Sequence, residues 1–302
     1  MTTLLAGAAT DAGKARDQNE DAVRLAEPGA PRVAERGFLA VVADGMGGHQ
    51  HGEVASQLAV ETLFADFYAP EDAGDASVAE RLKRAFRDAN EQILAEVASD
   101  EPGNAPGTTM VAAAVVADQL TIANVGDSRA YLVRAEAATQ ITNDHSLVAE
   151  QVKRGVMTVE EARESKHRNI ITRALGHRPK VDTDIFEIGL LPDDRVVLCT
   201  DGVHGLLEPD EIADLALEGT PERASRALID LAMERGSTDN VSAAILAFEP
   251  SVVPAAQAGP EPVAAGGRGS GLGRVLLVLL VIAIVAALVY LYLGGYLAGL
   301  FG

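Results

Sequence analysis

Three aspartates lie where apolar stretches of the sequence begin or end. Asp44 follows FLAVVA, Asp201 follows VVLCT, and Asp239 stands two residues before the run VSAAILAF. An aspartate at the end of a strand can point into a shared cleft, and three that meet there repel one another unless a cation lies among them. Carboxylate oxygens are hard ligands that suit Mg²⁺ or Mn²⁺. The sequence therefore predicts a divalent-metal site built from Asp44, Asp201 and Asp239.

Further acidic residues lie beside other apolar stretches. Glu20 and Asp21 are adjacent, and Asp127 belongs to a Gly-Asp-Ser-Arg sequence. A single Asp-Gly pair is usually an ordinary turn, but so many carboxylates at the edges of predicted elements favour one shared site. Gly45 follows Asp44 and allows a close approach of the backbone, so we expect its main-chain carbonyl to be a metal ligand too.

Strands and helices must position these acids. Short apolar runs bounded by Gly or Asp predict strands, and helical periodicity predicts helices over residues 53–67 and 78–97. Strands in series and helices in pairs indicate stacked α and β layers, and they argue against strict βαβ alternation. The predicted strands are 38–43, 110–117, 120–125, 130–133, 195–199 and 241–248.

The C-terminal part of the chain differs from the rest. Residues 275–293 are nineteen consecutive residues without a charge, and a helix of that length, at about 1.5 Å per residue, spans the ~30 Å core of a bilayer. Residues 250–274, rich in Pro, Gly and Ala, predict a flexible linker, and residues 294–302 a short tail. The sequence thus predicts a globular domain over residues 1–249 and one transmembrane helix.

The charges around this segment predict its orientation. Arg268 and Arg274 precede it, and no charge follows it as far as Gly302. Positive residues favour the cytoplasmic side, so we expect the domain in the cytoplasm, held on the cell (inner) membrane by a single pass. No basic region followed by an apolar run begins the chain, so no cleavable signal peptide is predicted.

Composition and motifs exclude several classes of protein. A net charge of −19 opposes nucleic-acid binding, which needs Lys and Arg. The single cysteine, Cys199, allows no internal disulfide, and Gly205 stands where a cysteine phosphatase needs Arg. Residues 7–15 lack the spacing of a nucleotide-binding loop. Residues 144–146, Asp-His-Ser, are too close in sequence for a hydrolase triad and predict a loop or a helix N-cap.

Seven short motifs follow one another along the sequence. They are Arg16-Asp17-Gln18-Asn19-Glu20-Asp21, Asp44-Gly45-Met46-Gly47-Gly48-His49, Gly107-Thr108-Thr109, Gly126-Asp127-Ser128-Arg129, Thr172-Arg173-Ala174-Leu175-Gly176, Thr200-Asp201-Gly202 and Asp239-Asn240-Val241-Ser242. In this order they resemble the motifs of the metal-dependent protein phosphatases of type 2C. The resemblance covers nearly all of residues 5–249 and is closest to the bacterial branch that opposes Hanks-type serine/threonine kinases.

This resemblance implies an α+β fold, a four-layer α-β-β-α sandwich with two packed, mostly antiparallel sheets. It also implies two Mn²⁺ or Mg²⁺ ions joined by a bridging hydroxide that attacks phosphoserine or phosphothreonine. Asp44 would bridge the ions, the Gly45 carbonyl would join one, and Asp201 and Asp239 would hold the other. Asp127, with Asp201, would hold a third and weaker ion.

The resemblance assigns further roles. Arg16 would bind the substrate phosphate with its planar guanidinium and act with Asp44 and Asp239 in catalysis. Glu20, Asp21 and Asn240 would support the metal ligands and orient the waters on the ions. The expected partners are phosphorylated proteins, serine/threonine kinases among them, and neither nucleic acid nor a nucleotide.

Two departures from the family pattern affect these roles. Met46 stands where relatives outside bacteria often carry a histidine that protonates the leaving group, so water on a metal is expected to do this here. His49 and His51 are nearby alternatives with weak support. Residues 144–176 match the flap that borders the active site, but residues 165–169 (SKHRN) differ from the family pattern, so substrate preference does not transfer.

Other functions remain open at this stage. A membrane-tethered pseudophosphatase would bind phosphoproteins without turnover and would lack a ligand such as Asp44 or Asp239, and both are present. A structural cation-binding module would leave Arg16 without a role. A phosphatase of a partner-switching pathway, acting on antagonists of anti-sigma factors, would share the same fold.

Overall fold

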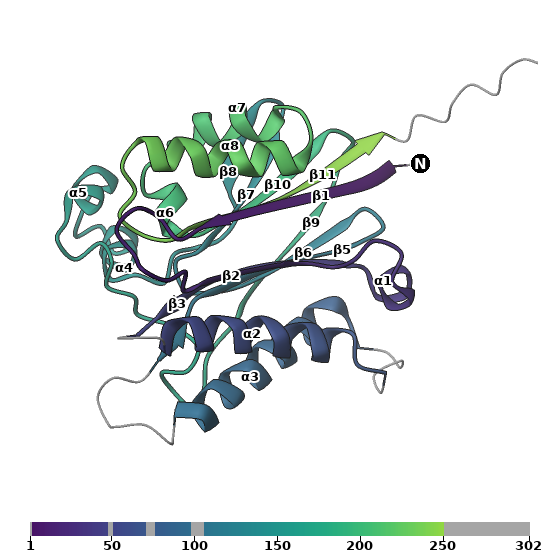
Figure 1. Cartoon of the computed structure of the whole chain (residues 1–302), viewed down its shortest axis with the longest axis horizontal. Coiled ribbons are helices and arrows are strands. Elements are labelled where there is room, and N and C mark those ends of the chain that lie inside the picture. Colours follow the sequence, from purple (N-terminus) through teal and green to yellow (C-terminus); the bar gives the residue numbers. More distant parts are fainter. Residues whose placement is uncertain (1, 48–50, 71–75, 98–105, 251–302) are drawn as a thin grey trace, which may run out of the picture. The chain divides into compact units, whose positions relative to one another are not determined.

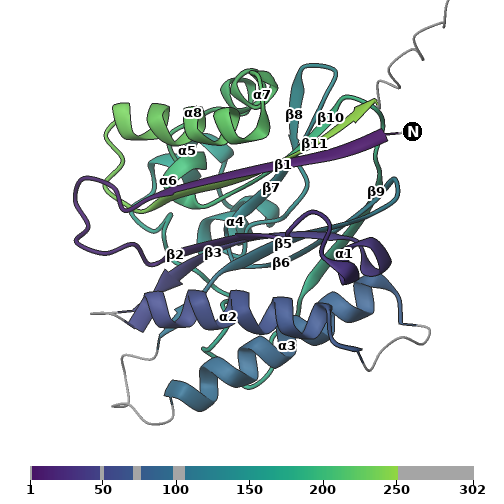
Figure 2. The ribbon, with the colours of Figure 1, turned by 45° about the vertical axis from the view of Figure 1, so that its right-hand side comes forward.

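Two β-sheets lie face to face, and helices cover the outer face of each sheet. The computed structural model describes residues 2–47, 51–70, 76–97 and 106–250. Figures 1 and 2 show four layers in the order α-β-β-α. The expected α+β sandwich of two antiparallel sheets is confirmed, since every strand pairing within each sheet is antiparallel.

The two sheets are built from strands that lie far apart in the sequence. The chain's first and last described strands are neighbours in the first sheet, which runs in the order β1 (Thr2–Asp11), β11 (Val241–Pro250), β10 (Asp194–Cys199), β7 (Arg129–Arg134) and β8 (Ala137–Gln140). The second sheet runs in the order β2 (Asp21–Leu25), β3 (Phe38–Met46), β5 (Met110–Val116), β6 (Gln119–Val125) and β9 (Asp184–Gly189), with the short β4 (Gly107–Thr108) paired to the end of β3.

The helices divide between the two outer faces. α2 (His51–Phe67) and α3 (Val78–Val97) pack on the second sheet, and α7 (Pro209–Leu217) and α8 (Pro221–Glu234) pack on the first. Three short helices, α1 (Pro31–Arg36), α4 (Leu147–Lys153) and α5 (Val159–Glu164), lie in connections, and α6 (Asp201–His204) follows β10 directly.

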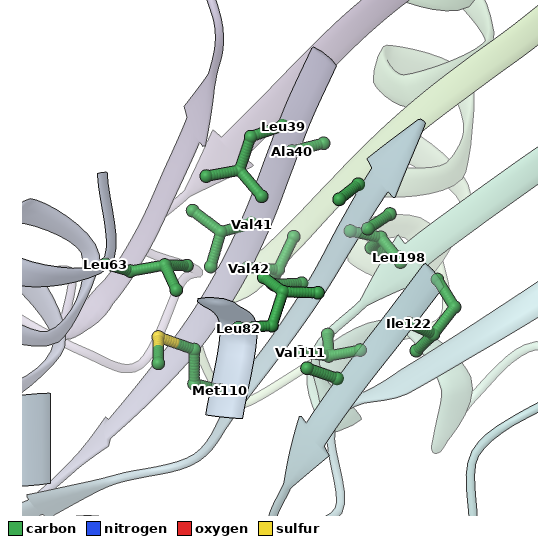
Figure 3. Packing of buried hydrophobic residues seen from close by; sticks show 14 of the residues in the cluster. Leu39, Ala40, Val41, Val42, Leu63, Leu82, Met110, Val111, Ile122 and Leu198 are labelled. Atoms are coloured by element: carbon green, nitrogen blue, oxygen red, sulfur yellow. The ribbon is translucent and has the colours of Figure 1, made fainter. Parts of the chain in front are cut away.

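The central strands are buried on both faces, which explains their unbroken apolar sequences. Side chains alternate between the two faces of a strand. In β10, Val196 and Leu198 join the larger core, which lies between the sheets and under α2 and α3, whereas Val197 and Cys199 join the smaller core under α7 and α8. Figure 3 shows Leu198 of the first sheet in the same packed cluster as Ile122 of the second.

The predicted strands and helices of the globular domain are present, and the sequence missed others. The two predicted helices lie within α2 and α3, and each of the six predicted strands corresponds to a strand of the structure. The strands β1, β2, β4, β8 and β9 were not predicted. β1 (TTLLAGAATD) is rich in Ala and Gly, which are depleted in strands, and β2 and β9 have only five and six residues.

Pro250, the first residue of the predicted linker, ends β11. The rest of the linker, the transmembrane helix and the tail lie outside the described residues, and they stay predictions. Within residues 2–47, 51–70, 76–97 and 106–250, none of the helices combines the length and the apolar character that a membrane crossing requires.

Because β10 is buried on both faces, we expect replacement of a leucine in β10 to destabilise the protein far more than replacement of an exposed leucine just before it. Leu198 is 0% exposed, whereas Leu191, in the turn before β10, is 53% exposed. Leu198→Ala should lower the free energy of unfolding by about 2–5 kcal/mol, because it leaves a cavity between the sheets. The matched change Leu191→Ala should cost less than about 0.5 kcal/mol. Urea unfolding of both variants measures this, and similar costs for the two would contradict the assigned packing.

Candidate metal centre

Two neighbouring strands bring two of the aspartates together. β2 and β3 are antiparallel, and Asp21 lies opposite Asp44 in their register. We expected Asp44 to end its strand, but this is wrong: β3 continues to Met46 and pairs there with β4. The Asp44 amide donates to the Thr109 hydroxyl at 3.1 Å, and the Thr109 amide donates to the Asp44 carbonyl at 2.9 Å. The backbone of Asp44 is therefore fixed on both sides.

Asp201 comes from the other sheet. β10 ends at Cys199, Thr200 is the N-cap residue, and Asp201 is the first residue of α6. The Thr200 hydroxyl donates to Asp21 Oδ2 at 3.0 Å and accepts from the Ser242 amide at 3.1 Å. These two bonds tie the end of the first sheet to Asp21 in the second sheet, so the two groups of acids share one end of the sandwich.

Asp239 precedes β11 and pairs with Arg16. Arg16 Nη2 lies 3.0 Å from Asp239 Oδ2 and 2.8 Å from Oδ1, and the Arg16 side chain is 47% exposed. Arg16 Nη1 also lies 4.0 Å from Glu20 Oε2. The predicted phosphate-binding guanidinium is thus at the solvent-facing edge of the acidic cluster, where a substrate phosphate could reach it.

Asn240 holds the segment that carries Arg16. Its side-chain amide donates to the carbonyls of Ala12 and Gln18 at 2.8 and 3.0 Å. Its side-chain oxygen accepts from the Glu20 amide at 2.8 Å. One side chain from the start of β11 therefore fixes the connection between β1 and β2, which Figures 1 and 2 show at the same end of the sandwich as α6.

Asp127 lies between β6 and β7 and is almost fully buried. Its residue exposure is 6%, and its Oδ1 has no hydrogen-bond partner among the described residues. The neighbouring Ser128 hydroxyl is 2.7 Å from the Thr109 hydroxyl. Because Thr109 also holds Asp44, this contact joins the segment around Asp127 to β3.

The aspartates raise one another's pKa. Burial and the nearby charges of Asp21 and Asp201 raise the pKa of Asp44 well above its ordinary value. Burial raises the pKa of Asp21 to about 7, with Asp201 and Asp239 contributing. Burial and the neighbouring Asp201 raise the pKa of Asp127 to about 7. Burial and Asp239 raise the pKa of Asp201 to about 6. Each carboxylate therefore opposes the ionisation of the next.

This environment fits divalent cations. Asp21 Oδ1 and Asp127 Oδ1 are buried without a hydrogen-bond partner in the described part of the chain, and a cation would satisfy them and neutralise the repulsion. Among the same residues, no three acidic or histidine side chains come close enough to enclose an ion by themselves. Water would have to complete the coordination, as the family resemblance implied.

Gly45 occupies a position that admits no side chain. Its amide donates to the Glu20 carbonyl at 3.1 Å. A Cβ at this position would lie 2.1 Å from the Gly52 carbonyl oxygen and 2.5 Å from the Glu20 carbonyl oxygen. β3 therefore passes tightly against the start of α2, and the role of the Gly45 carbonyl as a metal ligand stays a prediction.

The residue two positions after Asp44 cannot act as a protein acid. Met46, the last residue of β3, has no proton to donate. His51 begins α2, and His49 lies outside the described residues.

The Asp-His-Ser sequence at residues 144–146 is structural. Asp144 accepts three hydrogen bonds from the Arg129 guanidinium at 2.7–3.1 Å. His145 Nδ1 accepts from the Gly126 amide at 2.9 Å. Ser146 is the N-cap of α4, so the predicted cap is confirmed and no triad forms. Together these contacts anchor the start of the flap, residues 144–176, beside the segment that carries Asp127.

Several supporting residues were missed in the sequence. Thr200, Thr109 and Ser128 hold the acids in place through their hydroxyls. Each is adjacent to or inside a recognised motif, and hydroxyls flanking a metal-binding carboxylate are a signal that could have indicated this role.

The comparisons with known proteins agree with this geometry. A family model described as "Protein phosphatase 2C" matches residues 6–241. The chain belongs to the protein phosphatase 2C family. The serine/threonine phosphatase stp of Listeria welshimeri is 35% identical over 237 residues, covering 77% of this chain and 91% of the relative.

Solved structures give the same result. The serine/threonine phosphatase Stp1 from Staphylococcus aureus superposes with a TM-score of 0.75 at 36% identity, covering 82% of this chain and 96% of that one. The catalytic domain of the phosphatase PstP, in complex with two manganese ions, has a TM-score of 0.70 at 33% identity and covers 83% of this chain and 100% of that one.

The family and the site together define the activity. This phosphatase hydrolyses phosphoserine and phosphothreonine on proteins and depends on Mn²⁺ or Mg²⁺. The pseudophosphatase alternative is not favoured, since Asp44, Asp201 and Asp239 are all present at the centre.

The raised pKa of Asp127 predicts how pH affects the metal-free phosphatase. Its ordinary value is 3.8 and its folded value about 7, so between about pH 4 and pH 7 the folded state holds a proton that the unfolded chain has released. The wild type should therefore lose stability relative to Asp127→Asn as pH rises through this window. Thermal unfolding of both proteins in EDTA measures the difference.

Comparing the stability of the two proteins cancels the contribution of the buried histidines, which has the opposite pH dependence. Burial lowers the pKa of His145, His177 and His204, and these histidines destabilise the folded state at acidic pH in both proteins alike. A difference in melting temperature that stayed constant from about pH 4 to pH 8, or that shrank as pH rose, would contradict the assigned pKa.

Proposed function

We propose that this phosphatase acts on phosphorylated proteins at the cytoplasmic face of the cell membrane and opposes serine/threonine kinases there. The observation that carries the catalytic part of the proposal is the shared end of the two sheets, where burial and neighbouring carboxylates raise the pKa of four aspartates, Asp21, Asp44, Asp127 and Asp201. The repulsion within such a cluster is relieved when protons or a multiply charged cation balance the carboxylates.

In this proposal the metal ligands are the ones expected from the sequence. Asp44, the Gly45 carbonyl, Asp201 and Asp239 would hold two ions. The support is that β3 fixes the backbone of Asp44, while Asp201 at the start of α6 and Asp239 just before β11 come from the opposite sheet. When bound, such ions would supply an acidified water as the nucleophile for phosphorus at neutral pH.

The protein's own residues orient the substrate. Arg16 contacts Asp239 and faces solvent, so its guanidinium can bind two oxygens of a phosphate while staying next to the metal ligands. Glu20 and Asp21 orient water in the cleft, and Asn240 keeps the Arg16 segment in place. Met46 carries no transferable proton, so the departing seryl or threonyl oxygen takes its proton from water.

The membrane part of the proposal rests on the sequence alone. Residues 275–293 carry no charge, and Arg268 and Arg274 precede them. A helix of this kind would restrict the enzyme to substrates near the membrane surface, and kinases with their phosphorylated targets at that surface are the partners we propose.

The catalytic proposal predicts the effect of single carboxylate changes. Asp44→Asn and Asp239→Asn should each lower Mn²⁺-dependent release of phosphate from a phosphothreonine peptide by at least about 100-fold, since even residues that only support a metal ligand contribute roughly 10–100-fold. Asp118→Asn, an exposed turn position away from the site, is the matched control and should retain activity. Wild-type activity that is unchanged in EDTA would refute the metal mechanism.

The membrane proposal predicts where the protein fractionates. The full chain should sediment with membranes and require detergent for release, whereas a chain ending at Pro250 should remain in the supernatant. Ile284→Arg places a charge in the middle of the apolar segment, at a cost of about 2.5–3.5 kcal/mol, and should weaken membrane association. Equal fractionation of the full and shortened chains would exclude the anchor.

A further inference from the structure

One histidine connects the two segments that carry Asp201 and Asp127. His204 ends α6, the short helix that Asp201 begins. Its Nε2 lies 3.0 Å from the backbone carbonyl oxygen of Asp127. A carbonyl oxygen can only accept, so the imidazole must carry its proton on Nε2 and donate it. A single side chain thereby links α6 to the connection between β6 and β7.

Hydrogen bonds fix Asp127 and both of its neighbours in the sequence. Ser128 bonds to Thr109 through the two hydroxyls at 2.7 Å, and the Gly126 amide donates to His145 Nδ1 at 2.9 Å. Between them, the carbonyl of Asp127 accepts from His204. The Asp127 carboxylate projects from this rigid segment, and its buried Oδ1 lacks a partner among the described residues.

The negative charges of Asp127 and Asp201 repel each other and so favour separation of the two segments that His204 links. Asp127 is buried and Asp201 is half-buried, and like charges at short range repel strongly in a medium of low dielectric constant. The His204 bond opposes the separation of the two segments, because α6 cannot move away from Asp127 without breaking it. The link therefore holds α6, which begins with Asp201, next to the segment that carries Asp127.

We propose that His204 is a positioning residue that holds the Asp127 carboxylate against Asp201 for a third, weakly bound divalent cation. The inference rests on the proposed function, in which Asp127 and Asp201 contribute that ion's protein ligands. His204 does not touch the ion or the substrate. It acts through the backbone of Asp127, so its contribution is geometric, and the same bond from another donor could replace it.

The test compares two substitutions in the full chain. His204→Leu keeps a similar volume and removes the donor, whereas His204→Gln can place its amide nitrogen near the position of Nε2. Titration with Mn²⁺, with free Mn²⁺ followed by electron paramagnetic resonance, should show the weakest binding step reduced about 10-fold or more in His204→Leu. The tighter steps should be unchanged, and His204→Gln should recover most of the loss.

A second substitution shows whether His204 acts through Asp127. In an Asp127→Asn background, His204→Leu should cause no further loss of Mn²⁺ binding, because the group that it positions has lost its charge. Additive losses would overturn the proposal. A His204→Leu chain that binds Mn²⁺ like the wild type would also overturn it. A purely structural role would weaken all Mn²⁺ binding steps together and lower the melting temperature of the metal-free protein, and this result too would overturn the proposal.

The outcome also separates this inference from the proposed function. Wild-type chain that fails to release phosphate from a phosphothreonine peptide with Mn²⁺ would refute the proposed function. Active wild type with an unaltered His204→Leu titration would refute the role of His204 and leave the proposed function intact.

Discussion

The repulsion among five aspartates at one end of the sandwich is the constraint on which the rest of this structure depends. Asp21, Asp44, Asp127, Asp201 and Asp239 come from separate segments, and burial with mutual repulsion raises the pKa of the first four. The repulsion within such a cluster destabilises the metal-free protein, and a divalent cation that binds there relieves it, which increases the affinity for the cation. The fold must therefore hold carboxylates together against their own charge.

The carboxylates are held in place by strands that are buried on both faces and by hydrogen bonds from hydroxyl and amide side chains. The first-sheet strands β7, β10 and β11 contribute side chains to both cores, so they cannot shift without opening one of them. At the site, Thr200 ties the two sheets together, and Asn240 fixes the segment with Arg16. Neutral donors do this work because they hold acids in place without competing with a metal for their negative charge.

The connections between strands adapt the rigid frame to a substrate. Arg16 lies at the exposed edge, in a segment that is fixed by its neighbours and not by a strand of its own. The flap begins at a half-buried Arg129–Asp144 ion pair. It is further attached by Arg163 of α5, which bonds through both terminal nitrogens to Glu208 at 2.9 Å. Protein phosphatase 2C relatives share the frame, so differences in substrate preference must arise in such exposed segments.

The sequence by itself determined the types of metal-binding side chain, the family, and the succession of strands in series and helices in pairs. It could do so because the motifs keep short-range spacing and the apolar runs keep local periodicity. It did not determine that Asp21 lies opposite Asp44, that β3 continues past Asp44, or that Thr200 and His204 reach across to Asp21 and Asp127. Those contacts join residues that are remote in sequence, and they follow from strand register and from the packing of two sheets, which no local pattern encodes.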